Sequence, residues 1–307
     1  MTTDATWLVV GANGFLGSNA GAYLQGKATV VGTARSRTSF PSSSLFDSIV
    51  ECDITDSASV DFVIRSIKPD VVLNTAAIAS HELCEHDPDL AHQVNVVGPG
   101  NLARVTAETG ARFIHVSTDA VFDGARGNYS ETDTPSPFSS YGKSKFAGEI
   151  AVIDENPNAL IARTNFFGWS PTGTRSILEF FVNSLTKNLS VQGFNDYIVS
   201  SIYVQDLIQV LWDLNAESAS GIYHCVASNA LSKFDFGVAV AHQFGLDSSL
   251  IESTSSPAGA DGISRVRNLS LDTNKAARQL GHPLATQESG LQHAFGDRSL
   301  LRNEILS

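Results

Sequence analysis

A glycine-rich segment near the N-terminus constrains the fold more than any other feature of the chain. Gly11, Gly14 and Gly17 are spaced by three residues and directly follow the apolar run Trp7–Val10. Glycines at this spacing allow a sharp turn, close approach of a pyrophosphate to backbone amides, and tight packing of the next helix. The free N–H groups of that helix favour an anion. The segment therefore predicts a strand–turn–helix unit that binds a dinucleotide.

Short apolar runs alternate with longer amphipathic stretches through the first half of the chain. The apolar runs, which are typical of buried parallel strands, are Trp7–Val10, Ala28–Val31, Asp70–Leu73, Arg112–Val116 and Ala159–Ala162. The stretches with helical spacing are Phe15–Gln25, Ser57–Ile67, Leu90–Thr109 and Tyr141–Asp154. This alternation predicts an α/β fold with a Rossmann-type doubly wound parallel sheet.

The pattern changes near Trp169, where glycine and proline become frequent and regular alternation ends. A helix is expected over Ser176–Asn188, and Gly221–His224 has the pattern of a buried strand that returns to the main sheet. We therefore expect a dinucleotide-binding Rossmann domain over residues 1–168, with a returning segment near 201–226. A smaller mixed α/β substrate-binding lobe over residues 169–307 is expected to be interleaved with it.

Composition excludes several classes of partner. The formal net charge is −12, and no basic face is evident that could bind nucleic acid through its phosphates. No apolar stretch approaches the roughly 20 residues that cross a bilayer. Cys52, Cys84 and Cys225 are scattered and lack the spacing of metal ligands. We expect a cytoplasmic protein that acts on a small molecule and uses no metal.

The residues after the second strand indicate which dinucleotide is bound. NAD-binding sheets usually carry an acid there, which holds the ribose 2′-hydroxyl. This chain has Arg35, followed by Arg37, and an arginine can grip a 2′-phosphate with two hydrogen bonds. The segment predicts NADP(H) as the preferred cofactor, with NAD(H) as the alternative. Asp53, after the next strand, is expected to accept a hydrogen bond from the adenine amine.

Two further segments supply a catalytic set. Ser117 and Thr118 close the strand Arg112–Val116, at the sheet edge where ligands bind in open α/β sheets. Tyr141 and Lys145 are four residues apart on a predicted helix and therefore share one face. A lysine ammonium and the nicotinamide cation nearby are both expected to lower the pKa of the phenol. In this arrangement Tyr141 protonates a carbonyl oxygen as hydride arrives at carbon, Thr118 or Ser117 holds that oxygen, and Lys145 binds the nicotinamide ribose.

Taken together, these motifs resemble the extended short-chain dehydrogenase/reductases, and within them the dTDP-4-dehydrorhamnose reductase family. The likeness lies in GANGFLG (11–17), CDITD (52–56), NTAA (74–77), HVSTDAVFDG (115–124) and YGKSKFAGE (141–149). The resemblance implies NADPH-dependent reduction of the keto group of a nucleotide-linked 4-keto-6-deoxyhexose, and a homodimer. Besides Gly11, Gly14, Gly17, Arg35, Asp53, Tyr141 and Lys145, the cofactor-binding residues are expected to be Asn13, Phe15, Leu16, Ile54, Asn74, Ala76, Ala77 and Asn95.

The chain departs from that family around the expected sugar pocket. Where the family usually has an Arg-Thr-Ser-Trp type segment, this chain has Arg163–Gly168, which is one residue shorter and lacks tryptophan. Ile78–Glu82 also replaces a more usual aromatic and acidic pattern, and places His81 in a predicted loop. We expect His81, Asp119, Asn165 and Phe166 to contact the substrate, with solvated surface as the alternative for His81.

Four other functions compete with this reduction. One is another extended short-chain reductase that acts on a different carbonyl substrate. Related dehydratases need an acid pair after the threonine, whereas here Asp119 is followed by Ala120, which counts against dehydration. A sugar-nucleotide epimerase would use the same Tyr141 and Lys145, but usually with NAD. A regulatory subunit of methionine adenosyltransferase resembles the same family, binds NADP and docks on a partner enzyme. The amphipathic segment Leu300–Leu306 could serve such docking, although packing on the chain itself is favoured.

Overall fold

The computed structural model describes residues 5–36, 43–257 and 267–298. Arg37 and the segment Leu300–Leu306 lie outside the described residues. No helix within the described ranges is both long enough and apolar enough to span a membrane.

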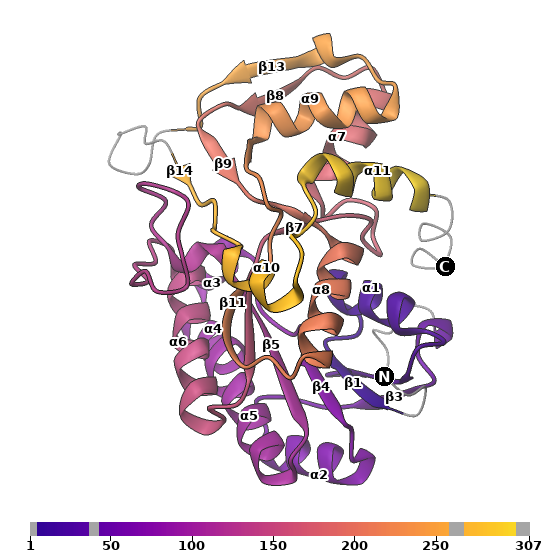
Figure 1. The fold of residues 1–307 in the computed structure, drawn as a ribbon, viewed down its shortest axis with the longest axis vertical. Coiled ribbons are helices and arrows are strands. Elements are labelled where there is room, and N and C mark those ends of the chain that lie inside the picture. The colour runs from indigo at the N-terminus through magenta and orange to yellow at the C-terminus, as the bar shows by residue number, and fades with distance from the viewer. Residues whose placement is uncertain (1–4, 37–42, 258–266, 299–307) are drawn as a thin grey trace.

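A parallel sheet forms the centre of the molecule (Figure 1). Within the described residues it has seven strands in the order β11-β6-β5-β4-β1-β2-β3. Their bounds are β1 Thr6–Val10, β2 Thr29–Ala34, β3 Ser48–Glu51, β4 Val71–Asn74, β5 Arg112–Thr118, β6 Leu160–Thr164 and β11 Gly221–His224. The strand order reverses between β1 and β4, as in Rossmann folds. The predicted fold class is therefore confirmed, and so is the return of Gly221–His224 to the main sheet.

Both faces of the sheet are buried. In β1, Trp7 and Val9 belong to one apolar cluster, whereas Leu8 and Val10 belong to another on the opposite face. The first face is covered by α1 (Phe15–Leu24) and α8 (Val204–Ala216), and the second by α2 (Ser57–Ile67), α5 (Gly98–Thr109) and α6 (Ser140–Glu155). Burial on both sides explains why these strands are continuously apolar.

The helix predicted over Leu90–Thr109 has a more complex form. It begins with α4 (Pro88–His92), passes through a π-helical turn, η3 (Gln93–Val97), and continues as α5. A short helix, α3 (His81–His86), precedes it where a loop was expected. Ser80 caps α3 by accepting a hydrogen bond from the Leu83 N–H. In a helix of only six residues, such a capping serine is a weak sequence signal for the helix start. The π-helical turn buries Asn95 next to the site described below.

Smaller elements stand at one end of the main sheet. We call the following set the cap region: α7 (Ile177–Thr186), β8 (Val191–Phe194), β9 (Tyr197–Val199), β12 (Leu231–Ser232), α9 (Lys233–Phe244), β13 (Ile251–Thr254), β14 (Arg267–Asn268) and α11 (Gln287–Asp297). Strand β9 lies between β12 and β14, and β13 pairs with β8. The pair β7 (Phe166–Phe167) and β10 (Ile202–Tyr203) lies between the cap region and the main sheet, and α10 (Asn274–Leu280) packs beside β11 (Figure 1).

Helix α7 agrees with its predicted position. Ser176 and Glu179 form a capping box, in which each side chain accepts a hydrogen bond from the backbone at the other residue. The helix ends at Thr186, two residues before the predicted end. This cap fixes the start of the first cap-region helix next to the cleft.

Candidate active site

A cleft of about 1200 Å³ lies at the carboxyl ends of the central strands. Its walls come from the glycine turn, from the ends of β4, β5 and β6, from α6, and from the cap region. Its lining includes Gly14, Phe15, Leu16, Ala77, Thr118, Tyr141, Lys145, Asn165, Tyr197 and Arg267. The predicted dinucleotide turn and the predicted catalytic set therefore face one continuous space.

The glycine turn has the geometry that the sequence predicted. Gly11 has a φ of +84°, and a Cβ atom there would lie 2.8 Å from the backbone nitrogen of Ala76. A Cβ atom on Gly17 would lie 2.1 Å from the carbonyl oxygen of Gly11, so α1 packs against the turn only because residue 17 has no side chain. Gly14 caps α1 without a side-chain hydrogen bond, which leaves the helix N-terminus available to an anion.

The other expected cofactor residues surround this turn or follow the neighbouring strands. Arg35 follows β2 directly and is exposed, whereas the Asp53 carboxylate accepts hydrogen bonds from the backbone N–H and hydroxyl of Thr55. Asn74 ends β4, and its Oδ1 accepts the Ala76 N–H. Asn95, in the π-helical turn, accepts the Ile78 N–H through Oδ1 and donates to the Ile78 carbonyl through Nδ2. The same Nδ2 also donates to the Ser144 hydroxyl.

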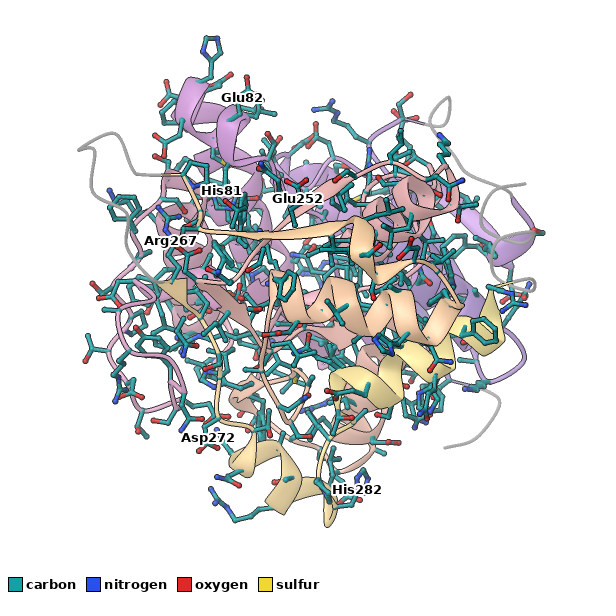
Figure 2. All side chains as sticks on the ribbon, turned by 90° about the horizontal axis from the view of Figure 1, so that it is seen from above. His81, Glu82, Glu252, Arg267, Asp272 and His282 are labelled. Carbon is teal, nitrogen blue, oxygen red and sulfur yellow. The ribbon has the colours of Figure 1, made fainter. Side chains whose placement is uncertain are left out.

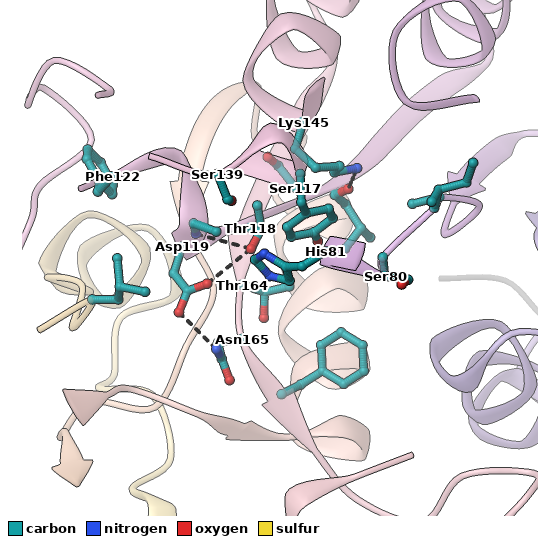
Figure 3. Close-up of a pocket in the computed structure, with 18 of the residues that line it drawn as sticks. Ser80, His81, Ser117, Thr118, Asp119, Phe122, Ser139, Lys145, Thr164 and Asn165 are labelled. Atoms are coloured by element: carbon teal, nitrogen blue, oxygen red, sulfur yellow. Dashed lines mark hydrogen bonds between the residues drawn. The ribbon is translucent and has the colours of Figure 1, made fainter. Parts of the chain in front are cut away.

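Tyr141 and Lys145 lie one turn apart on α6 and both line the cleft. Figure 3 shows Lys145 at this site. Lys145 is buried, and its Nζ donates to the Val116 carbonyl at 2.7 Å. Burial lowers the pKa of Lys145 to about 8, against an opposing effect of Glu149. Burial also raises the pKa of Tyr141 to about 12, with a smaller lowering by a hydrogen bond to Thr118. The lowering expected from the Lys145 ammonium is not found, because desolvation dominates and the charges of Asp119 and Cys84 act in the same direction. The lowering expected from the nicotinamide cation stays a prediction.

Thr118 and Ser117 differ in what their hydroxyl groups contact. The Thr118 hydroxyl lines the cleft, donates to Asp119 Oδ1 at 3.0 Å, and accepts the Ala120 N–H (Figure 3). The Ser117 hydroxyl instead donates to Glu149 Oε1 at 2.5 Å. Glu149 in turn forms a fully buried, two-pronged ion pair with Arg163. The Ser117 hydroxyl is therefore part of a buried network with Glu149 and Arg163, whereas the Thr118 hydroxyl is not.

The expected substrate residues Asp119 and Asn165 are joined to each other. Asn165 Nδ2 donates to Asp119 Oδ2 at 2.9 Å (Figure 3). Burial raises the pKa of Asp119 to about 6, although the hydrogen bonds from Asn165 and Thr118 oppose this. Phe166 contacts Phe15 edge to face, with ring centroids 5.1 Å apart, which joins the expected sugar pocket to the start of α1.

His81 is the first residue of α3, so its placement in a loop was wrong. Its ring contacts that of Tyr141, with centroids 4.8 Å apart, and it lines the cleft. Burial lowers the pKa of His81. The negative charge of Glu85 acts in the opposite direction, whereas the positive charge of Arg267 lowers this pKa further. His81 and Arg267 lie near one another on the same side of the molecule (Figure 2).

Three cationic side chains at the site were not anticipated from the sequence. Arg175 and Arg267 line the cleft, and Lys233 lines a smaller cavity of about 210 Å³ that shares Asn165, Phe166 and Tyr197 with it. The Lys233 ammonium lies 4.0 Å from the centre of the Tyr197 ring. Among the described residues, none of the three cations forms an ion pair with an acidic side chain. No local pattern marks them, because Arg175 precedes α7, whereas Lys233 and Arg267 lie on separate elements of the cap region. Within the same described ranges, no cluster of metal-binding side chains is found.

Comparisons with known proteins place this site in a family. The model of the RmlD substrate binding domain matches residues 5–299. The chain belongs to this family. It is 35% identical over 301 residues to a probable low-salt glycan biosynthesis reductase, Agl14, of Haloferax volcanii, covering 95% of this chain and 98% of that protein. It is 31% identical over 281 residues to the beta subunit of methionine adenosyltransferase 2 of Pongo abelii, covering 87% and 80%.

A solved structure shows the same fold. The chain matches dTDP-4-dehydrorhamnose reductase of Bacillus anthracis in complex with NADP with a TM-score of 0.80, at 24% identity, over 96% of this chain and 99% of that one. Similarity at this level of identity supports the fold. Together with the family match, these findings confirm the predicted resemblance: the RmlD-family chain is an NAD(P)-dependent oxidoreductase of the short-chain dehydrogenase/reductase type.

Proposed function

We propose that this RmlD-family protein uses NADPH to reduce the keto group of a nucleotide-linked 4-keto-6-deoxy sugar. The observation that carries the proposal is the cleft itself, which combines the glycine turn, the Thr118, Tyr141 and Lys145 set, and cations from the cap region. In a chain of net charge −12, Arg175, Lys233 and Arg267 gather at one site, and within the described part of the chain none of them forms an ion pair with an acidic side chain. This local positive charge favours an anionic substrate such as a nucleoside diphosphate sugar.

The residues present fit a bound dinucleotide. The uncapped N-terminus of α1 suits a pyrophosphate, because both its N–H groups and its dipole favour negative charge. Arg35, exposed directly after β2, suits a ribose 2′-phosphate and supports a preference for NADPH over NADH. When bound, the cofactor supplies hydride to the carbonyl carbon. Lys145, with its Nζ anchored on Val116, is placed to bind the nicotinamide ribose.

The chain itself supplies the proton for the reduction. Tyr141 stays protonated through the neutral range, since burial raises its pKa to about 12, so it can donate its proton to the carbonyl oxygen. The Thr118 hydroxyl can hold the same oxygen after turning away from Asp119 Oδ1. The ammonium form of Lys145 then stabilises the phenolate that remains. Asp119 and Asn165, joined by their hydrogen bond, provide polar groups for the sugar hydroxyls.

Two alternatives share most of this site. An epimerase would use the same Tyr141 and Lys145 but would retain its cofactor tightly through turnover. A regulatory role finds support in the 31% identity to the beta subunit of methionine adenosyltransferase 2. The completeness of the Thr118, Tyr141 and Lys145 set favours turnover over a binding role. The absence of an acid at Ala120 does not favour dehydration.

The direct test is NADPH oxidation by the purified protein with a panel of dTDP-, GDP- and UDP-linked 4-keto-6-deoxy sugars. We expect turnover of at least one of them and a loss of about 10²- to 10⁴-fold in Tyr141→Phe, because the variant lacks the proton donor. Tyr23→Phe is the matched control, since Tyr23 lies on α1 and does not line the cleft. Tight NADPH binding without turnover of any panel member would contradict the proposed reductase.

A further inference from the structure

A histidine that the proposed mechanism does not use lies directly beneath its lysine. His115 is fully buried in the middle of β5, between Asn74 of β4 and Lys145 of α6. Its Nδ1 is 3.1 Å from Asn74 Nδ2, and its Nε2 is 3.5 Å from Lys145 Nζ. Helix α6 can approach this closely because Gly148 has no side chain: a Cβ there would lie 2.1 Å from the carbonyl oxygen of Asn95.

The hydrogen bonds of Asn74 determine which nitrogen of His115 carries the proton. Asn74 Oδ1 accepts the backbone N–H of Ala76 at 3.1 Å, so the NH₂ end of the amide must face His115 Nδ1. Nδ1 therefore accepts a hydrogen bond, and the proton of the neutral imidazole is on Nε2. That N–H points toward Lys145 Nζ.

This orientation matters because Lys145 has two protonation states. An ammonium has only donors, so an Nε2–H facing it at 3.5 Å gives two donors opposite each other. A neutral amine has a lone pair that can accept from Nε2–H while one of its own hydrogens remains on the Val116 carbonyl. The Asn74–His115 arrangement therefore favours the neutral amine over the ammonium.

We propose that His115, oriented by Asn74, is a positioning residue that sets the protonation equilibrium of Lys145 and thereby the upper pH limit of catalysis. The inference rests on the proposed function for its catalytic consequence, but not for its effect on Lys145. Burial and the charge of Lys145 hold the pKa of His115 well below its ordinary value, so the imidazole stays neutral. It therefore acts through its N–H dipole and carries no charge of its own.

Other ionisable groups also surround Lys145 and Tyr141. On α6, Glu149 opposes the lowering of the Lys145 pKa, but it is itself paired with Arg163 of β6. After β5, Asp119 acts on Tyr141, and from α3 Cys84 does so as well, while His81 contacts the Tyr141 ring. None of these groups replaces the contact that His115 makes with Nζ.

The primary test is a titration of Lys145 followed by NMR of protein carrying ¹³C-labelled lysine, with the signal assigned by its loss in Lys145→Met. His115→Phe keeps a ring of similar shape and removes both nitrogens. We expect the titration midpoint of Lys145 to rise by about one pH unit, which is a tenfold change in the equilibrium. Phe113→Leu is the matched control, because Phe113 is the buried ring neighbour of His115 on the same strand. It should leave the midpoint in place.

A second variant keeps the proposal testable if His115→Phe does not fold. Asn74→Asp is nearly isosteric and can still accept the Ala76 N–H, but it offers an oxygen to Nδ1. The imidazole proton then moves to Nδ1, and Nε2 accepts from the ammonium, so the Lys145 midpoint should rise here too. Asn74→Asp also adds a negative charge, which could raise the Lys145 midpoint by itself. The double variant with His115→Phe measures this charge effect alone, because no imidazole remains to change its tautomer.

The kinetic readout is the pH profile of kcat/KM with the keto sugar that is turned over. The basic limb should move upward together with the Lys145 midpoint in His115→Phe and stay unchanged in Phe113→Leu. An unchanged midpoint, or equal shifts in both variants, would overturn the role of His115. A profile that stays in place while the midpoint moves would overturn its catalytic consequence. If no keto sugar is reduced, the proposed function fails, but the NMR titration still decides whether His115 controls Lys145.

Discussion

The two walls of the cleft are built in different ways. The wall formed by the main sheet comes from a few contiguous segments: the glycine turn before α1, the end of β5 and the first turns of α6. The wall formed by the cap region comes from Tyr197, Lys233 and Arg267, and Arg175, just before α7, extends it. These residues are spread over nearly a hundred positions. Under the proposed function, the first wall would carry chemistry that many substrates can share, whereas the second would select a particular substrate.

The first prediction tests the wall formed by the main sheet at its tightest contact. Gly17→Ala places a methyl group 2.1 Å from the Gly11 carbonyl, so α1 must move away from the turn. Overpacking of this kind costs about 1–3 kcal/mol, and we expect NADPH affinity to fall by about a hundredfold, measured by calorimetry. Gly296→Ala in α11 is the control, because its added Cβ would meet nothing within 4 Å. Equal NADPH affinity in the two variants would show that the turn does not require this packing.

The second prediction tests the wall formed by the cap region. Lys233→Met keeps a side chain of similar length and removes the charge beside Tyr197. If this wall holds the anionic part of the substrate, KM should rise about tenfold or more with little change in kcat, since charged hydrogen bonds contribute about 1.5–3 kcal/mol. Lys187→Met, at an exposed position after α7, is the matched control. A fall in kcat at constant KM would place Lys233 in the chemical step instead.

The third prediction concerns the cofactor end of the main-sheet wall. Arg35→Ala removes the only described arginine directly after β2. We expect NADPH binding to weaken about tenfold and NADH binding to change little, because only NADPH has the 2′-phosphate. Binding of both cofactors measured side by side checks this. Equal losses of affinity for NADPH and NADH would mean that Arg35 supports the fold of the turn and does not bind the 2′-phosphate.

The same division explains how much the sequence could predict. The main sheet and the positions of Gly11, Tyr141 and Lys145 follow from local periodicity and spacing, because parallel strands bring their carboxyl ends to one edge. Helix α3 was missed because it is only six residues long and contains no apolar repeat. Lys233 and Arg267 could not be placed, since their positions depend on the pairing of short cap-region strands. The pKa of Tyr141 is raised and not lowered in this structure because burial, a tertiary property, outweighs the hydrogen bond from Thr118.

The smallest expected effect separates two adjacent hydroxyl groups that the sequence treats alike. Ser117→Ala removes the hydrogen bond to Glu149, although Arg163 still holds both carboxylate oxygens. We expect the free energy of unfolding to fall by about 1–2 kcal/mol, measured with denaturant, while kcat/KM stays within about threefold of the parent value. Thr118→Val should instead lower activity by more than tenfold, because Thr118 lines the cleft. It should also lower the free energy of unfolding by about 1–2 kcal/mol, because the hydroxyl bonds Asp119 and the Ala120 N–H, so activity is the measurement that separates the two variants. A large loss of activity in Ser117→Ala would mean that the end of β5 presents both hydroxyl groups to the substrate. The buried Arg163–Glu149 pair would then serve to orient Ser117, and its role would extend from stability to catalysis.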